Sequence, residues 1–192
     1  MVESLVRFAN IIENAITRIG RIAAWAGLAL VLVTVFDVIT RNFSQSSWDV
    51  LRNLSIAQQK SFGSTLLQEL EWHLHTVLFL FCLGYAYIKG AHIRIDVFRE
   101  KFSESTKAWI EIAGIILFLL PFCLLVITFS IDFATSSYLQ HEGSASGGGL
   151  PNRWIIKATL PAGLILLAIS GIAILLKQIA VLAGLVLQQE DS

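Results

Sequence analysis

The sequence has few charged residues and no excess of either sign. Asp, Glu, Lys and Arg make up 15% of its 192 residues, and 14 basic residues balance 14 acidic ones. This balance gives no reason to expect nucleic-acid binding, which depends on a basic excess. Hydrophobic residues make up 55% of the chain, which is more than a soluble domain of this length could bury. The composition therefore predicts an integral membrane protein.

Cysteine is also scarce. The chain has two, Cys82 and Cys123, and both lie inside long apolar runs. They do not form the disulfide framework of a secreted domain, and we expect both to behave as small buried hydrophobic side chains. We expect no cleaved signal peptide, because the first apolar run starts late, is long and lacks a small-residue cleavage site.

Four apolar runs without charged residues predict four membrane-spanning helices. Each run approaches the roughly 20 residues that a helix needs to cross about 30 Å of hydrocarbon, where a helix satisfies its own backbone hydrogen bonds. Pro121 and Pro161 interrupt the last two runs, and we expect a kink at each. The sequence predicts an all-α membrane protein with a single membrane domain over residues 1–192 and spans at about residues 20–41, 71–89, 108–132 and 156–178.

Lys and Arg are unevenly distributed around these spans. Nine of them fall in the N-terminal segment, the second loop and the C-terminal end, and five fall in the first and third loops. Loops rich in Lys and Arg stay in the cytoplasm. Both termini are therefore predicted to be cytoplasmic, with the first and third loops on the outer side.

Three segments outside the spans have distinctive composition. Apolar residues recur at helical spacing in residues 1–19, which predicts an amphipathic helix lying on the inner leaflet. The first outer loop, from Arg41 to Glu71, is too apolar for a free loop, so we expect one or two short helices in it. The last outer loop contains Gly143–Gly149, a flexible-linker composition that ends just before Pro151.

No charged residue lies near the centre of a predicted span, where ion-coupled transporters usually place one. Asp37 comes closest, about one turn from the outer end of the first span. Arg41 follows four residues later, which is the spacing of an ion pair on a helix surface. We interpret the two as a structural pair at the membrane interface, and a functional role for Asp37 stays open.

His73 and His75 raise the question of a metal or haem site. Residues two apart on a helix point roughly 200° from each other, so these two cannot bind one metal ion. No other span contains a histidine, so one chain cannot supply haem ligands from two helices. Hydrogen bonds to Glu69 and Glu71, each four residues earlier, explain both histidines. We predict no catalytic site, metal or cofactor.

The densest polar pattern is Gly90–Phe98, directly after the second span. Polar and apolar residues alternate there, which predicts an extended turn at the cytoplasmic end of the span. The turn is either a simple positively charged anchor or a structured loop in which Asp96 neutralises Arg94. Pairs of small residues four apart, which could let helices approach closely, are Ala23 with Gly27, Ala158 with Ala162, and Ala180 with Gly184.

Four motifs in order resemble the small membrane subunit (Q-type, DctQ-like) of tripartite ATP-independent periplasmic, or TRAP, transporters. The resemblance covers about residues 20–180, and its most recognisable part is the His-Ile-Arg-Ile-Asp segment. The motifs are Asp37–Phe43, Glu69–Leu74 followed by Gly84–Tyr87, Gly90–Val97, and Gly149–Ala158 followed by Pro161–Gly163.

The resemblance implies a scaffold role in a bacterial inner membrane. In this family a periplasmic binding protein (P-type) captures an organic acid anion, and a much larger membrane subunit (M-type) carries the substrate and sodium sites. The small subunit packs beside the large one and among membrane lipids. The substrate itself stays unidentified. Residues that the resemblance and the polar pattern mark as structural or interface candidates are Asp37, Arg41, Glu71, Trp72, His92, Arg94, Asp96, Pro151 and Lys157.

The first outer loop also contains candidates for docking the binding protein. Trp48, Arg52 and Lys60 combine apolar and charged groups, a mixture suited to a transient contact. Alternatively, the apolar residues of this loop rest on lipid or on the large subunit.

Two other classes of function are weighed against the scaffold. The first is a membrane anchor for a quinone- or haem-binding redox enzyme, which the absence of histidine from spans one, three and four disfavours. The second is a small transporter acting alone, which would need a charged residue inside a span.

Overall fold

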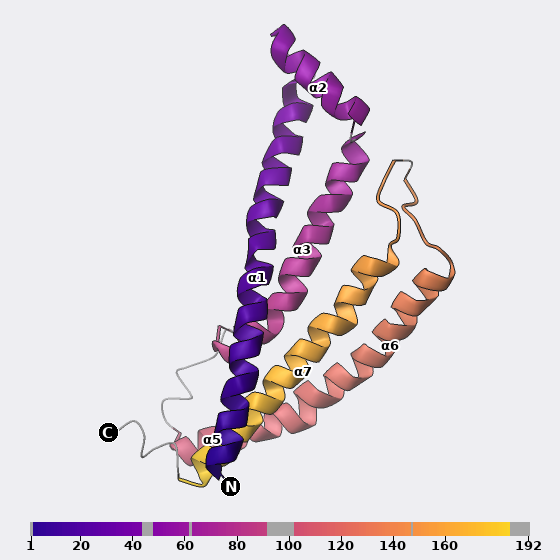
Figure 1. Cartoon of the computed structure of the whole chain (residues 1–192). Coiled ribbons are helices and arrows are strands. Elements are labelled where there is room, and N and C mark those ends of the chain that lie inside the picture. The colour runs from indigo at the N-terminus through magenta and orange to yellow at the C-terminus, as the bar shows by residue number, and fades with distance from the viewer. Residues whose placement is uncertain (1, 44–47, 62, 92–101, 147, 185–192) are drawn as a thin grey trace.

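The computed structural model describes residues 2–43, 48–61, 63–91, 102–146 and 148–184. Over these residues the chain contains helices and no strands, which confirms the predicted all-α class (Figure 1). The helices are α1 (Val2–Asn42), α2 (Asp49–Ser61), α3 (Gly63–Ile88), α5 (Glu104–Gly114), the π-helix η2 (Ile115–Leu119), α6 (Leu120–Leu139) and α7 (Trp154–Leu182).

Three helical stretches among the described residues are long and apolar enough to cross a membrane. They are α1, the continuous run Glu104–Leu139, and α7. The remaining long helix, α3, is not among them, and its first half has the polar residues Glu69, Glu71, His73 and His75. Length and composition therefore support three crossings, and a fourth crossing at α3 stays a prediction.

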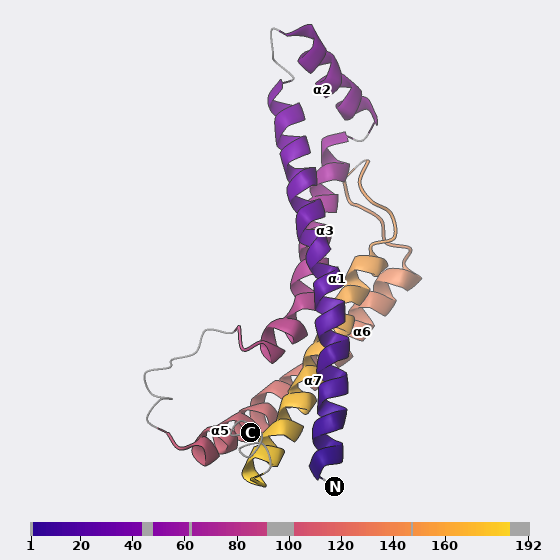
Figure 2. The same cartoon turned by 60° about the vertical axis from the view of Figure 1, so that its left-hand side comes forward.

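The helix α7 is the centre of the bundle, because it packs against α1, α3, α5 and α6. Figures 1 and 2 show α1 beside α3 and α6 beside α7, with α2 across one end of the α1–α3 pair. At the opposite end, the start of α1 lies near the end of α7, where Lys177 forms an ion pair with Glu13 at 2.7 Å. The described ends of the chain therefore share one end of the molecule.

Glycine allows α3 and α7 to pack closely. A Cβ atom on Gly163 would lie 2.7 Å from the carbonyl oxygen of Leu80, and one on Gly84 would lie 3.0 Å from the carbonyl oxygen of Leu166. Backbone atoms cannot move aside as a flexible side chain can, so both positions require glycine. Of the small residues expected to matter from sequence, Gly27 does face another helix, with a Cβ position 3.3 Å from Leu78.

The N-terminal segment differs from its prediction. Residues 1–19 were expected to form a separate helix on the inner leaflet, but α1 runs without interruption from Val2 to Asn42. At 1.5 Å per residue it is about 60 Å long, roughly twice the hydrocarbon thickness. Ala9 and Ile16 on its apolar face are buried within the protein, where α7 packs alongside α1. Protein therefore covers part of the face that we expected lipid to cover.

The first outer loop is helical, as expected. The helix α2 packs against both α1 and α3, and Gly63, the first residue of α3, has a φ of 67°. This left-handed conformation favours glycine. Farther along the chain, the expected distortion near Pro121 takes the form of the π-helix η2 directly before α6. A proline lacks the N–H group that a regular helix would use there.

Candidate functional site

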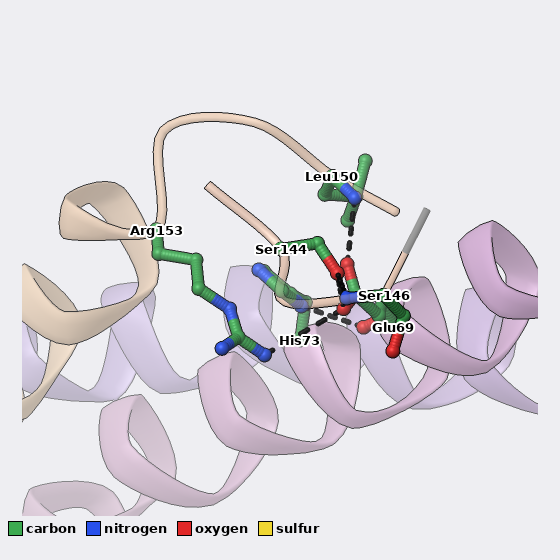
Figure 3. A network of polar contacts seen from close by, with 6 residues as sticks. All are labelled: Glu69, His73, Ser144, Ser146, Leu150 and Arg153. Carbon is green, nitrogen blue, oxygen red and sulfur yellow. Dashed lines mark hydrogen bonds and ion pairs between the residues drawn. The ribbon is translucent and has the colours of Figure 1, made fainter. Parts of the chain in front are cut away.

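The main polar site of the described structure surrounds Glu69 near the start of α3. Its side chain is almost fully buried, with 7% of the residue exposed. The carboxylate accepts hydrogen bonds from the hydroxyl of Ser144 and, at 2.6 Å, from the backbone N–H of Leu150. Arg153 lies 3.6 Å away as an ion-pair partner. Figure 3 shows these groups converging on one side chain from the α6–α7 connection and the start of α7.

Glu69 thereby fixes a connection whose composition predicted a flexible linker. The Ser144 hydroxyl also accepts the backbone N–H of Ser146 at 3.1 Å, which closes a small turn. Gly149 passes so near that a Cβ atom there would lie 2.5 Å from a carboxylate oxygen of Glu69. The glycine is needed for this close approach.

The charge of Glu69 is stabilised where it lies, two residues before the predicted second span. The hydrogen bond from Ser144, the hydrogen bond from Leu150 and the nearby Arg153 guanidinium hold the pKa of the Glu69 carboxyl below its ordinary value. Burial acts in the opposite direction, but the hydrogen bonds outweigh it. Glu69 is therefore a buried carboxylate that stays ionised and carries structure.

A second ion pair joins the two ends of the segment between α6 and α7. The Lys157 ammonium, one turn into α7, donates a hydrogen bond to the Glu142 carboxylate. It also lies 4.0 Å from the ring centre of Phe133 on α6. The backbone N–H of Arg153 donates to the carbonyl of Glu142 at 2.9 Å. The hydrogen bond from Lys157 is the main reason that the pKa of Glu142 is lowered.

The predicted ion pair between Asp37 and Arg41 is present. Asp37 is buried, with 1% of the residue exposed, whereas 48% of the Arg41 side chain is exposed. With its amide suitably oriented, Gln68 on α3 also accepts from both terminal nitrogens of Arg41, at 3.1 Å. One oxygen of Asp37 has no hydrogen-bond partner among the described residues. The pair thus links α1 to α3 as well as stabilising α1 itself.

The structure confirms a hydrogen-bonded contact for His73 but not the one expected for His75. His73 Nδ1 lies 2.6 Å from the backbone carbonyl oxygen of Glu69, so the predicted contact with Glu69 is present and is made to its backbone. No hydrogen bond joins His75 to Glu71 among the described residues, and one Glu71 oxygen is buried without a partner. Trp72, beside His73, lies under the Arg153 guanidinium. The central carbon of the guanidinium, Cζ, is 5.7 Å from the centre of the Trp72 ring.

The other candidates are dispersed. Pro151 is exposed in the α6–α7 connection, next to Leu150. On α2, Arg52 pairs with Asp49, and Lys60 is exposed, as is the preceding Trp48. His92, Arg94 and Asp96 lie outside the described residues. Among the candidates that the structure describes, Trp72, Pro151 and Lys157 lie at or next to the polar site around Glu69.

The polar contacts described above hold helices together. Within the described ranges, no group of three or more His, Cys, Asp or Glu side chains could hold a metal ion. The described carboxylates of the cluster are occupied by Ser144, Leu150 and Lys157. Such a network fixes the relative positions of α3, α7 and the connection that joins α6 to α7.

The sequence model for the DctQ component of tripartite ATP-independent periplasmic transporters matches residues 30–181. The chain belongs to this family. It is a component of a transporter rather than an enzyme, and the redox-anchor alternative is not favoured. The match runs from the second half of α1 through α7 and includes both Asp37 and Glu69. No curated protein and no solved structure shows a significant match.

Sequence reasoning missed the central role of Glu69 and the contribution of Glu142. Glu69 was noticed only as a partner for His73 and as part of a motif. Its true partners, Ser144 and Leu150, are 75 and 81 residues away in the chain. The available signal was weak: an acidic residue just outside the second apolar run, and a Gly-Ser stretch between the third and fourth runs.

Proposed function

We propose that this DctQ-family subunit is the fixed support of a sodium-coupled TRAP transporter for an organic acid anion. Its partners are a large M-type membrane subunit, which moves the substrate, and a P-type periplasmic binding protein, which delivers it. Family membership supports this role most strongly. The absence of charged residues from the middle of the apolar runs also supports it, because ion-coupled transport needs groups that bind ions within the membrane.

In this proposal the protein lies in the bacterial inner membrane, and α3 is its fourth membrane-spanning helix. The helix packs against both α1 and α7, two of the helices that are apolar enough to cross. Its polar first half, with Glu69 buried by the α6–α7 connection, lies at the outer side. Both termini then face the cytoplasm, in agreement with the excess of Lys and Arg there.

The packing of the helices supports the proposal that this subunit is a fixed support. Glycines allow close contact of α3 with α7, the Glu69 network fastens the outer connection, and the ion pair between Glu13 and Lys177 fastens the opposite end. The support must stay still while the large subunit moves. Links between helices at both ends of the bundle help it to do so. The first outer loop, with its docking candidates Trp48, Arg52 and Lys60, forms part of the surface that receives the binding protein.

Co-purification tests the proposed partnership. The chain would be tagged and expressed with an M-type subunit from the same operon, and the stoichiometry of the purified complex would be measured. We expect a stable complex that survives detergent extraction and size-exclusion chromatography. A tagged chain that is well folded but elutes alone under mild extraction would contradict the scaffold role. An untagged chain expressed with a tagged M-type subunit is the matched control.

A further inference from the structure

A groove of about 340 Å³ lies beside the Glu69 cluster, between α3, α6 and the start of α7. Its walls are mostly apolar or aromatic, and two basic side chains lie at one end. The residues that line it are Trp72, Thr76, Leu80, Phe133, Arg153, Ile156, Lys157 and Leu160.

Among the residues that line this groove, Arg153 has hydrogen-bond donors without a close acceptor. Its Nε atom is buried without a hydrogen-bond partner, and its guanidinium donates to no side chain among the described residues. The nearest carboxylate oxygen, on Glu69, is 3.6 Å away, too far for a good hydrogen bond. Trp72 supports the guanidinium from one face. A planar guanidinium with an unpaired N–H group and no short hydrogen bond to a carboxylate is well suited to bind a phosphate group.

The aromatic residues near the groove indicate its depth. Trp72 lines it, and Trp154 packs edge-on against Tyr138 at a ring distance of 5.3 Å just beyond it. Trp and Tyr are enriched where the hydrocarbon meets the headgroups. Arg153 and Lys157 lie at the same level, as basic side chains at the ends of spans commonly do. In the proposed topology the groove therefore extends from the headgroup level into the hydrocarbon.

We propose that this groove binds one glycerophospholipid of the outer leaflet. The lipid phosphate accepts hydrogen bonds from the Arg153 guanidinium, with the Lys157 ammonium nearby, and one acyl chain lies along Leu80, Ile156 and Leu160. The combination of an arginine whose Nε is unpaired with an apolar wall matches an amphipathic anion. A small soluble anion would gain nothing from that wall, and a neutral lipid would gain nothing from Arg153. The inference rests on the membrane topology and not on the transport role.

Lipid titration by native mass spectrometry of the purified full chain tests the proposal. The probe is phosphatidylglycerol, with diacylglycerol as the comparison that lacks phosphate and inorganic phosphate as the comparison that lacks chains. We expect phosphatidylglycerol to bind with a stoichiometry of one tight site, and neither comparison to compete at equal concentration. Arg153→Gln should weaken the tight site about tenfold or more, because it removes charge-assisted hydrogen bonds.

Two further variants separate binding from folding. Thr76→Trp fills the groove without altering any charge and should also weaken the tight site at least tenfold. Lys177→Gln removes a basic residue at the other end of α7, where it pairs with Glu13, and should leave the affinity within about twofold. Tight binding that survives both Arg153→Gln and Thr76→Trp, equal competition by diacylglycerol, or equal competition by inorganic phosphate would each overturn the proposal.

Discussion

The carboxylate of Glu69 accepts the backbone N–H of Leu150 at 2.6 Å, although the two residues are 81 positions apart. This bond joins the N-terminal part of α3 to the connection that leads into α7. Ser144 and Arg153 complete the contact from either side of Leu150. A Gly-Ser stretch whose composition predicts a flexible linker is therefore held against α3 in this DctQ-family subunit.

Adding one methyl group at Gly149 should release this connection. The Cβ atom of Gly149→Ala would lie 2.2 Å from the Ser144 hydroxyl oxygen and 2.5 Å from a Glu69 oxygen, so both cannot keep their places. We expect the amides of residues 144–150 to exchange with deuterium about tenfold faster, which corresponds to a loss of about 1.4 kcal/mol. Gly143→Ala is the matched control, since its Cβ position meets nothing within 4 Å. Equal exchange in the two variants would show that Glu69 does not restrain the connection.

Acid should weaken the Glu69 contact. Because the folded pKa of Glu69 is lowered from its ordinary value of about 4.5, the stabilisation is fully present above that value. It is lost as the pH falls through the lower, folded pKa. We expect the wild type to be more stable than Glu69→Gln by about 1–3 kcal/mol at neutral pH. This difference should shrink below about pH 4.5. Thermal unfolding of both proteins between neutral pH and about pH 3 measures the difference, and a difference that grows on acidification would contradict this account.

Labelling of single cysteines tests the proposed topology. In a background without Cys82 and Cys123, Ser103→Cys and Ser146→Cys would be treated with an impermeant thiol reagent in intact cells. Ser103 caps the start of α5 and Ser146 lies in the α6–α7 connection, at opposite ends of the bundle. We expect position 146 to react and position 103 to react only after the cells are opened. Reaction at position 103 but not at position 146 in intact cells would show that the subunit has the opposite orientation.

Charge reversal on α2 tests docking of the binding protein. Arg52→Glu combined with Lys60→Glu should chiefly slow the productive encounter, because charges at the edge of a contact act mainly on association rate. Uptake measured against binding-protein concentration should show a raised half-saturation point and a nearly unchanged maximal rate. The defect should shrink at high salt, as charges are screened. An unaltered curve at low salt would instead mean that α2 rests on the membrane or on the large subunit.

The features that the sequence predicted correctly are local ones. The four apolar runs lie within the long helices, and the first outer loop contains α2, because composition and helical spacing act over a few turns. The ion pair between Asp37 and Arg41 is present for the same reason, since residues four apart are neighbours on any helix. Such contacts need no knowledge of the other helices.

The features that the sequence could not reveal depend on how helices meet. Nothing local distinguishes Gly84 and Gly163, which face the backbone of a neighbouring helix, from Gly114, which faces open space. The continuity of α1 was missed because an amphipathic pattern predicts a helix but not whether lipid or α7 covers it. The partners of Glu69 were missed because they become neighbours only after α3 and α7 have packed together.

Reconstituted transport tests the central claim most directly. The purified chain, an M-type subunit and a P-type binding protein loaded with substrate would be combined in proteoliposomes with a sodium gradient, and uptake would be followed with each component left out in turn. The account predicts uptake only when all three are present, with none from this chain alone. Sodium-driven uptake by liposomes that contain this chain and no large subunit would contradict it.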